Sequence, residues 1–126
     1  RTLATVNGNR VYMAGGELNG DNGAAFGASP VQFVSTFRVR HAFISIGAID
    51  AVAGPADNYL AEAEFARMVL TCGENRFILT DSTKFGKRAL IKVCDFSDVD
   101  VIVSERPPPF DLAGKLAAEN VRFDVA

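Results

Sequence analysis

The residues best suited to chemistry stand in one short segment, where an apolar run ends abruptly in polar side chains. Phe77-Ile78-Leu79 is followed, after one residue, by Asp81-Ser82-Thr83-Lys84. A lysine ammonium can bind a phosphate, and carboxylate and hydroxyl oxygens can hydrogen-bond the hydroxyl groups of a small polar ligand. In open α/β sheets, ligands bind beyond the carboxyl ends of the strands. The segment therefore predicts that Asp81, Ser82 and Lys84 contact a small phosphorylated ligand.

Small or charged residues follow the other predicted strands as well. They are Gly15 and Gly16 after residues 10–14, Gly47 and Asp50 after residues 42–46, and Ser104 and Glu105 after residues 99–103. Because the carboxyl ends of parallel strands share one edge, we expect these groups to converge on one rim and form a ligand site. In this hypothesis the two glycines at 15 and 16 allow close backbone approach to the ligand. Asp50, Asp81 and the helix residue Glu62 accept hydrogen bonds from ligand hydroxyls.

Each of these residues also has a purely structural explanation. A glycine pair without a longer fingerprint is typical of a tight turn, and a lone Asp after a strand commonly caps a turn. A Glu on a helix is commonly solvated. Lys84 is the hardest to explain in this way, although surface lysines are common. His41 has no evident nucleophile or metal-ligand partner, so we interpret it as structural rather than catalytic.

A predicted alternation of strands and helices positions these residues. Strands are expected over residues 10–14, 42–46, 76–80, 99–103 and 121–125, with a short or irregular one over 90–93. One helix is expected to begin at the cap Ser29, with Pro30 in its first turn. Two more are expected over 58–72, with Gly73 as the cap, and over 111–119. Gly54-Pro55 is interpreted as part of a loop. The near-continuous apolar strands and their order predict an α/β fold, with a mostly parallel sheet flanked by helices. No linker is visible, so we expect residues 1–126 to form a single domain.

The composition excludes several classes of protein. The chain has 126 residues, of which 48% are hydrophobic and 22% charged, which is enough for one compact core. The formal net charge of -2 argues against direct DNA binding by this domain, since DNA-binding domains are usually basic. The two cysteines, Cys72 and Cys94, have no metal or redox spacing and are expected to be reduced thiols of a cytoplasmic protein. No metal or cofactor site is evident in the sequence. No apolar run approaches the roughly 18 residues of a membrane helix. Because the first residue is Arg1 and not Met, we expect a fragment of a longer chain.

The segments already named resemble the C-terminal effector-sensing domain of DeoR-family bacterial transcriptional repressors. The similar blocks are Ala14-Gly15-Gly16-Glu17-Leu18, Phe33-Val34-Ser35-Thr36-Phe37-Arg38, Gly47-Ala48-Ile49-Asp50, Glu62 and Asp81-Ser82-Thr83-Lys84-Phe85-Gly86. They occur in order along essentially the whole chain. The last block is the most specific, with Thr83 where the family usually has Ser. Within the family, the Phe33-to-Arg38 helix and the run Pro107-Pro108-Pro109 look most like the glycerol-3-phosphate regulon repressors.

The resemblance implies a fold, a ligand class and a partner. The fold would be shared with ribose-5-phosphate isomerase and glucosamine-6-phosphate deaminase. The ligand would be a sugar phosphate or polyol phosphate, with glycerol 3-phosphate favoured, whose binding relieves DNA binding by the repressor. A winged helix-turn-helix that binds DNA, and the family's first phosphate loop, are expected upstream of Arg1, in a protein that forms a homo-oligomer. The resemblance also implies a sensor that is not an enzyme.

Two alternatives remain open. The first is a sugar-phosphate isomerase or deaminase, in which Asp50 and Glu62 would resemble the catalytic acid and the helix Glu. The loop Ala53-Gly54-Pro55-Ala56 lacks the lysine and the glycine run that would stabilise an enediolate, which disfavours this activity. The second alternative is an oligomerisation domain with an inactive pocket, which no phosphorylated metabolite would stabilise.

Overall fold

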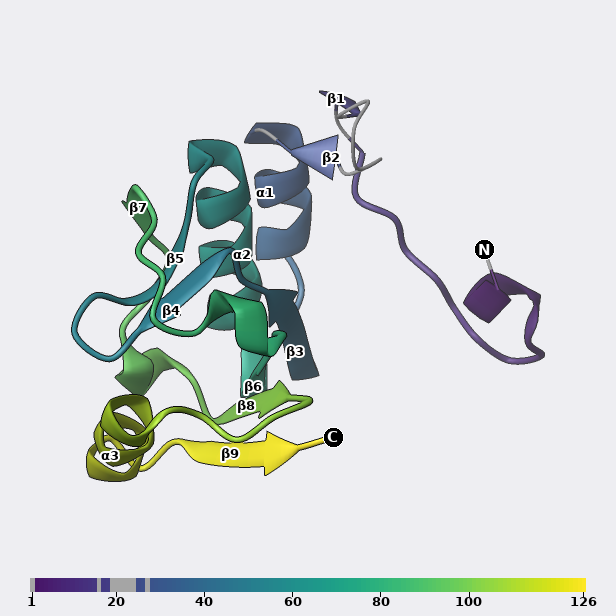
Figure 1. Cartoon of the computed structure of the whole chain (residues 1–126). Helices are drawn as coiled ribbons and strands as arrows, with labels where there is room; N and C mark the ends of the chain where they lie inside the picture. Colours follow the sequence, from purple (N-terminus) through teal and green to yellow (C-terminus); the bar gives the residue numbers. More distant parts are fainter. Residues whose placement is uncertain (1, 16, 19–24, 27) are drawn as a thin grey trace.

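A four-stranded parallel sheet forms the centre of the computed structural model, which describes all residues except 1, 16, 19–24 and 27 (Figure 1). The strands are β3 (Val39–Ser45), β6 (Gly73–Leu79), β8 (Val101–Ser104) and β9 (Arg122–Val125), in the spatial order β3-β6-β8-β9. Every neighbouring pair is parallel. The prediction of a mostly parallel α/β sheet is confirmed, and these four strands overlap the strands predicted over 42–46, 76–80, 99–103 and 121–125.

Three α-helices of the described residues accompany the sheet: α1 (Ala28–Ser35), α2 (Leu60–Cys72) and α3 (Phe110–Ala118). Helix α2 buries Ala63, Ala66 and Leu70, which recur every three or four residues and so lie on one face. Helix α3 buries Leu112 and Leu116 in the same way. Helices α2 and α3 begin and end within two residues of their predicted bounds. Helix α1 begins at Ala28, so the predicted cap Ser29 lies inside its first turn.

A second, smaller sheet was not predicted in full. It contains β4 (Ala48–Asp50), β5 (Gly54–Asp57) and β7 (Ile91–Lys92), paired antiparallel. The predicted loop at Gly54-Pro55 is wrong, because these residues begin β5 and close a hairpin with β4. Gly54 takes a φ of 78°, which suits glycine at the end of a tight connection. The short strand expected over 90–93 is confirmed as β7.

The predicted first strand over residues 10–14 is wrong. The segment is extended and exposed, apart from half-buried Ala14, and it pairs with no strand of the described chain. Its strand-forming Val and Tyr residues find no backbone partner there, and Tyr12 instead packs on Phe37 with ring centroids 5.4 Å apart. The nearest strands in sequence are the two-residue pair β1 (Glu17–Leu18) and β2 (Ala25–Phe26). The β propensity of the segment was therefore not sufficient to place it in a sheet.

One hydrophobic core lies between the main sheet, helices α2 and α3 and the small sheet. Its largest fully buried side chains include Ile49, Ile78, Ile102, Leu112 and Leu116. Cys94 is buried in this core, and burial raises its pKa to about 12, so it remains a thiol. Cys94 and half-buried Cys72 are both free, as expected. No helix among the described residues is both long enough and apolar enough to span a membrane.

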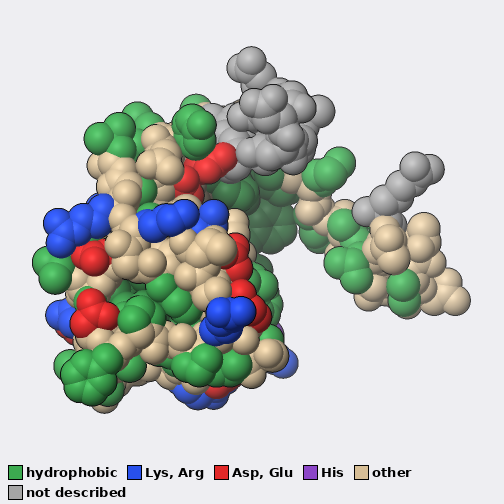
Figure 2. All heavy atoms as spheres, in the orientation of Figure 1, with side chains coloured by type: hydrophobic (Ala, Val, Ile, Leu, Met, Phe, Trp, Pro, Cys, Tyr) green, Lys and Arg blue, Asp and Glu red, His purple; other side chains and the backbone are tan. Residues whose placement is uncertain are grey.

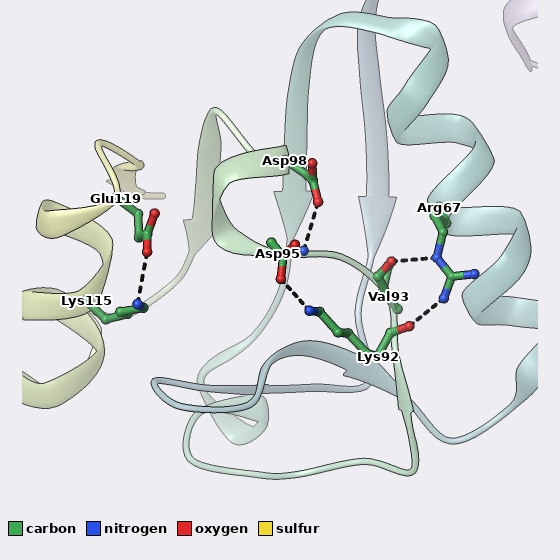
Figure 3. Close-up of polar contacts among 7 residues, drawn as sticks. All are labelled: Arg67, Lys92, Val93, Asp95, Asp98, Lys115 and Glu119. Atoms are coloured by element: carbon green, nitrogen blue, oxygen red, sulfur yellow. Dashed lines mark hydrogen bonds and ion pairs between the residues drawn. The ribbon is translucent and has the colours of Figure 1, made fainter.

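A polar network ties helix α2 to the small sheet (Figure 3). Arg67 donates from Nε to the Val93 carbonyl at 3.0 Å and from Nη2 to the Lys92 carbonyl at 2.6 Å. Lys92 in turn forms an ion pair with Asp95. Asp98 accepts the Asp95 N–H at 2.9 Å, which closes the turn that leads towards β8. These contacts stabilise the scaffold rather than the predicted ligand site.

Charged side chains of both signs are interspersed over the face of the molecule shown in Figure 2. On that face, basic groups lie beside acidic groups, with hydrophobic side chains between them. This distribution agrees with a formal net charge of -2.

Gly73 is required by packing rather than by helix capping. It follows α2 directly, as predicted, but with an extended φ of -95° that any residue can adopt. A Cβ built at Gly73 would lie 2.5 Å from the Ala42 Cβ and 3.2 Å from the Ala42 backbone nitrogen. Because Ala42 is buried in the neighbouring strand β3, neither atom can rotate away.

We therefore expect Gly73→Ala to destabilise the domain by about 1–3 kcal/mol. Gly114→Ala in the exposed middle of α3 is the matched control, because a Cβ there meets no atom within 4 Å. That control should stabilise the helix by about 0.5–1 kcal/mol. Urea unfolding of both variants measures the two changes, and equal effects would contradict the steric argument.

Candidate functional site

The turn that follows β6 brings three predicted site residues together. Asp81 begins a single 3-10 turn over Ser82–Lys84, and its Oδ1 accepts the Thr83 N–H at 2.9 Å and the Thr83 hydroxyl. Lys84 donates its backbone N–H to the Asp81 carbonyl at 3.1 Å. The contacts with Thr83, with help from nearby Lys84, hold the pKa of Asp81 below its usual value. Asp81, Ser82 and Lys84 therefore lie in one turn beyond the carboxyl end of β6, as predicted.

Lys84 is the residue of this turn best placed to bind an anion. Its side chain is half-buried. No carboxylate of the described residues lies within 4.0 Å of its ammonium group, so no ion pair there competes with a ligand. A compact lysine ammonium of this kind is a common phosphate-binding group. The turn thus offers an available positive charge next to hydroxyl groups.

Glu105 connects the turn to the end of β8. Its Oε1 accepts the Ser82 N–H at 2.6 Å, and its Oε2 accepts the Ser82 hydroxyl at 3.2 Å. The hydroxyl of Ser104, which is only 2% exposed, donates to the same Oε1 at 2.8 Å. The Ser104 hydroxyl, followed by the two Ser82 donors, lowers the pKa of Glu105. The sequence predicted Glu105 on the rim but not its contact with Ser82, because no fixed sequence spacing predicts a contact between the ends of two strands.

The carboxyl-terminal end of the turn is attached to the small sheet. Phe85 forms an isolated parallel bridge with Ile49, and Gly86 donates its N–H to the Ile49 carbonyl at 2.9 Å. Gly86 has a φ of 73°, a backbone conformation that favours glycine. The segment from Asp81 to Gly86 is therefore fixed at one end to β8 and at the other to β4.

Asp50 has a structural role in the small sheet. Its Oδ2 accepts the Ala53 N–H at 2.7 Å and the Val52 N–H at 3.1 Å, which caps the connection between β4 and β5. Arg88 also lies 3.3 Å from Oδ2. The Ala53 N–H is the main cause of the lowered pKa of Asp50, with Val52 and Arg88 adding to it. The alternative stated for a lone Asp, that it caps a turn, describes what Asp50 does here, and a contact with a ligand stays a prediction.

Gly47 and Asp50 do not share a strand end. Gly47 lies just before β4 and Asp50 is the last residue of β4, so about 10 Å of extended chain separates the two. A Cβ at Gly47 would lie 3.0 Å from Oδ1 of Asp57, so the missing side chain leaves room for that carboxylate. Glu62, five residues after Asp57, is half-buried in the first turn of α2. The structure thus places Asp50 beside the Lys84 turn, through the bridge of Ile49 with Phe85. Gly47 lies beside Asp57 and follows β3, whose last residue Ser45 is paired with Leu79 of β6.

The glycine pair contributes little that can be described. Gly15 is exposed, and a Cβ built there meets no atom within 4 Å. Crowding by the described residues is therefore not the reason for a glycine at this position. Gly16 lies outside the described residues. The expected approach of a ligand to this backbone stays a prediction.

Three hollows are lined by described residues. One, of about 420 Å³, is largely apolar and is lined by residues such as Phe33, Phe37 and Phe65. A second, of about 510 Å³, lies near Arg38 and Glu74, and a third, of about 250 Å³, lies between Arg67 and Arg76. None of the three is lined by a predicted site residue. Nor do three or more His, Cys, Asp or Glu side chains gather as a possible metal site in the part of the chain that the structure describes.

Four carboxylates, three of them near the candidate site, predict a loss of stability in acid. The pKa values of Asp50, Asp81, Asp100 and Glu105 are all lowered from ordinary values of 3.8 for Asp and 4.5 for Glu. For Asp100 the chief cause is Arg76, whose Nε lies 3.2 Å from its Oδ2. A carboxyl group with a lowered folded pKa stabilises the fold above its unfolded pKa, and this contribution disappears as the pH falls through the folded value.

We therefore expect the free energy of unfolding to be level from pH 7 to 5 and to fall below about pH 4. Chemical denaturation at pH 7, 5 and 3 measures this. Asp100→Asn should lower stability at pH 7 and reduce the further loss between pH 5 and pH 3. A free energy of unfolding that is unchanged at pH 3 would contradict the interpretation.

The parallel sheet and its flanking helices define an α/β domain, and comparison with known proteins gives its family. The chain belongs to the DeoR C terminal sensor domain family, whose model matches residues 1–106. This confirms the family resemblance and the fold type shared with ribose-5-phosphate isomerase and glucosamine-6-phosphate deaminase.

The curated relatives carry the names of transcription regulators. The chain is similar to the glycerol-3-phosphate regulon repressor of Escherichia coli K12, at 25% identity over 98% of this chain and 49% of that protein. It is 30% identical to the repressor of the same name from Haemophilus influenzae, over 78% of this chain and 38% of that protein. It is 26% identical to the HTH-type transcriptional repressor CsqR of Escherichia coli K12, over 90% of this chain and 43% of that protein. The chain spans about half the length or less of these relatives.

Proposed function

We propose that this chain is the effector-binding domain of a bacterial transcriptional repressor that senses a phosphorylated sugar or polyol. The observation that carries this proposal is the turn beyond β6. It presents Lys84, a half-buried residue, next to Ser82 at the carboxyl edge of a parallel sheet, in a chain of the DeoR sensor family. Glycerol 3-phosphate is the favoured ligand, because two of the relatives are named as repressors of the glycerol-3-phosphate regulon.

Each site residue has a place in this proposal. Lys84 offers its charge to the phosphate or to an oxygen near it. Asp81 binds Thr83 through Oδ1, which leaves Oδ2 to accept a hydrogen bond from a ligand hydroxyl. Ser82 has a hydroxyl that donates to Glu105 and can still accept a hydrogen bond. The remaining residues proposed for the site are Gly15, Gly16, Gly47, Asp50 and Glu62.

Ligand binding would act on DNA through another part of the protein. We place a winged helix-turn-helix and a first phosphate loop upstream of Arg1, in a cytoplasmic homo-oligomer. The ligand relieves repression only if it binds the DNA-free arrangement more tightly than the DNA-bound one. A coupling free energy of about 1–3 kcal/mol is typical of such regulation.

A thermal-shift screen of the full-length protein tests this function. The panel contains glycerol 3-phosphate, ribose 5-phosphate and glucosamine 6-phosphate, with unphosphorylated glycerol as a control. A ligand present at 100 times its dissociation constant should add about 2.7 kcal/mol of stability. A protein that none of these phosphates stabilises would instead match the alternative of an oligomerisation domain with an inactive pocket.

We also propose that the domain senses its ligand without converting it. In an isomerase or deaminase, Asp50 would have to serve as an acid, whereas here its Oδ2 is occupied by Val52, Ala53 and Arg88. An assay for conversion of ribose 5-phosphate or glucosamine 6-phosphate by the full-length protein decides the point. Turnover would displace the sensor proposal in favour of the enzyme.

A further inference from the structure

The Lys84 turn depends on a side chain from outside it. Ser82 gives both of its donors to the Glu105 carboxylate, its N–H to Oε1 at 2.6 Å and its hydroxyl to Oε2 at 3.2 Å. Both oxygens of Glu105 are therefore bound to protein donors, and Oε1 also accepts from Ser104 at 2.8 Å. A carboxylate occupied in this way is better suited to hold the turn than to bind a ligand hydroxyl.

Strand β8, which ends just before Glu105, is well fixed. Ser104, the residue before it, is 2% exposed and accepts the Ala126 N–H at 2.8 Å through its carbonyl. Thr80, just before the turn, donates its N–H to the Val103 carbonyl at 2.9 Å, which extends the pairing of β6 with β8. Glu105 thus joins the turn to a rigid part of the main sheet.

The turn itself has few other restraints near Ser82. A 3-10 turn has poorer hydrogen-bond geometry than an α-helix, and here the Phe85 N–H lies 3.3 Å from the Ser82 carbonyl. Asp81 caps the turn only through contacts within the same segment. Hydrogen bonds from N–H groups to a charged carboxylate are stronger than those between neutral groups. The Glu105 contacts are therefore the main link between the amino-terminal end of the turn and the rest of the molecule.

We propose that Glu105 is a positioning residue for ligand binding, which holds the turn over Ser82–Lys84 in the conformation that presents Lys84. As far as the ligand is concerned, this rests on the proposed function. Without Glu105 the turn samples several conformations. The ligand must then order the turn when it binds, and the lost conformational entropy lowers the affinity. Glu105 acts through Ser82 and does not touch the ligand.

The sign of the effect distinguishes positioning from simple electrostatics. Glu105 places a negative charge near a site proposed for a phosphate, so removing that charge alone should strengthen phosphate binding. Loss of the positioning contacts should weaken it. In the full-length protein, we expect Glu105→Ala to weaken binding of glycerol 3-phosphate about tenfold, measured by titration calorimetry. Glu105→Gln keeps an oxygen for the Ser82 N–H and nearly the same shape, and should stay within about threefold of the wild type.

A matched control removes a carboxylate elsewhere on the surface. Glu119, which directly follows helix α3, accepts a hydrogen bond from Lys115 at 2.9 Å, far along the chain from the Lys84 turn (Figure 3). Glu119→Ala should leave the affinity for glycerol 3-phosphate unchanged. Tighter or unchanged binding by Glu105→Ala would overturn the positioning role.

Hydrogen exchange supplies a readout that needs no ligand. In the unliganded full-length protein, Glu105→Ala should speed exchange of the Ser82, Thr83, Lys84 and Phe85 amides, while the amides of β6 and β8 keep their protection. Unchanged exchange in the turn would overturn the proposal. If the wild type binds none of the phosphates in the panel, the proposed function fails, and the exchange comparison alone then decides whether Glu105 holds the turn.

Discussion

Replacing Lys84 with alanine is expected to remove most of the stability that a phosphorylated ligand adds to the full-length protein. A hydrogen bond to a charged group contributes about 1.5–3 kcal/mol, so its loss should weaken binding by about 10-fold to 100-fold. At a ligand concentration of 100 wild-type dissociation constants, the stabilisation then falls from about 2.7 kcal/mol to roughly 0.4–1.4 kcal/mol. The unliganded variant should remain folded, because Lys84 makes no ion pair among the described residues. Thermal shift with and without glycerol 3-phosphate measures both quantities.

Lys87→Ala is the matched control for this experiment. Lys87 has the same charge and lies three residues further on, but it is exposed and follows the turn. The Lys87→Ala substitution should reduce the ligand's stabilising effect only slightly, because an exposed charge is screened by solvent and salt. Equal losses in the two variants would indicate a diffuse positive potential rather than a specific contact. A Lys84→Ala protein that responds like the wild type would place the phosphate elsewhere.

Ile102→Ala is expected to have the largest effect on the fold itself. Ile102 is 0% exposed and lies in β8, in register between Ile78 of β6 and Phe123 of β9. Its truncation leaves a cavity in the centre of the parallel sheet that rigid neighbours on both sides cannot fill. Large-to-small substitutions of this kind cost about 2–5 kcal/mol, which is a large fraction of the stability of a typical domain.

An exposed valine gives the control for Ile102→Ala. Val52 is 84% exposed in the connection between β4 and β5, so Val52→Ala should change stability by no more than about 0.5 kcal/mol. Urea unfolding of the two variants measures the difference. A loss below about 1 kcal/mol for Ile102→Ala would mean that the sheet repacks around the cavity, contrary to the packing described here.

The main sheet was predictable because its strands are buried on the core face and read as apolar runs. Ile78 and Ile102, both fully buried, each lie in the middle of such a run. Helix α2 was predictable from the spacing of its buried residues. The small sheet was not, since β4 and β5 have only three and four residues and one of them begins with Gly54-Pro55. Two residues of that kind are typical of a turn, and tertiary pairing overrode the local preference.

The candidate site was predictable only where it is local in sequence. Asp81, Ser82 and Lys84 occupy one turn, so a single apolar run followed by polar residues was enough to find them. Asp50 was assigned to the same strand end as Gly47, because a strand as short as β4, which Asp50 ends, leaves no pattern in the sequence. Glu105 was recognised as a rim residue, but its contact with Ser82 joins residues 23 positions apart. Such contacts depend on strand order, which periodicity does not specify.

The hydrogen bond from the Gly86 N–H to the Ile49 carbonyl means that the Lys84 turn connects the main sheet with the small sheet. The turn continues directly from β6 of the parallel sheet, and its far end is anchored on the hairpin of β4 and β5. A displacement of the turn cannot stay local, because it must either break that bond or carry the hairpin with it. Ile49 is 0% exposed and rests in the core, so carrying the hairpin would also shift side chains beneath it. Methyl resonances of Ile49 should accordingly report on events at the Lys84 ammonium, although the isoleucine itself lies out of reach of solvent.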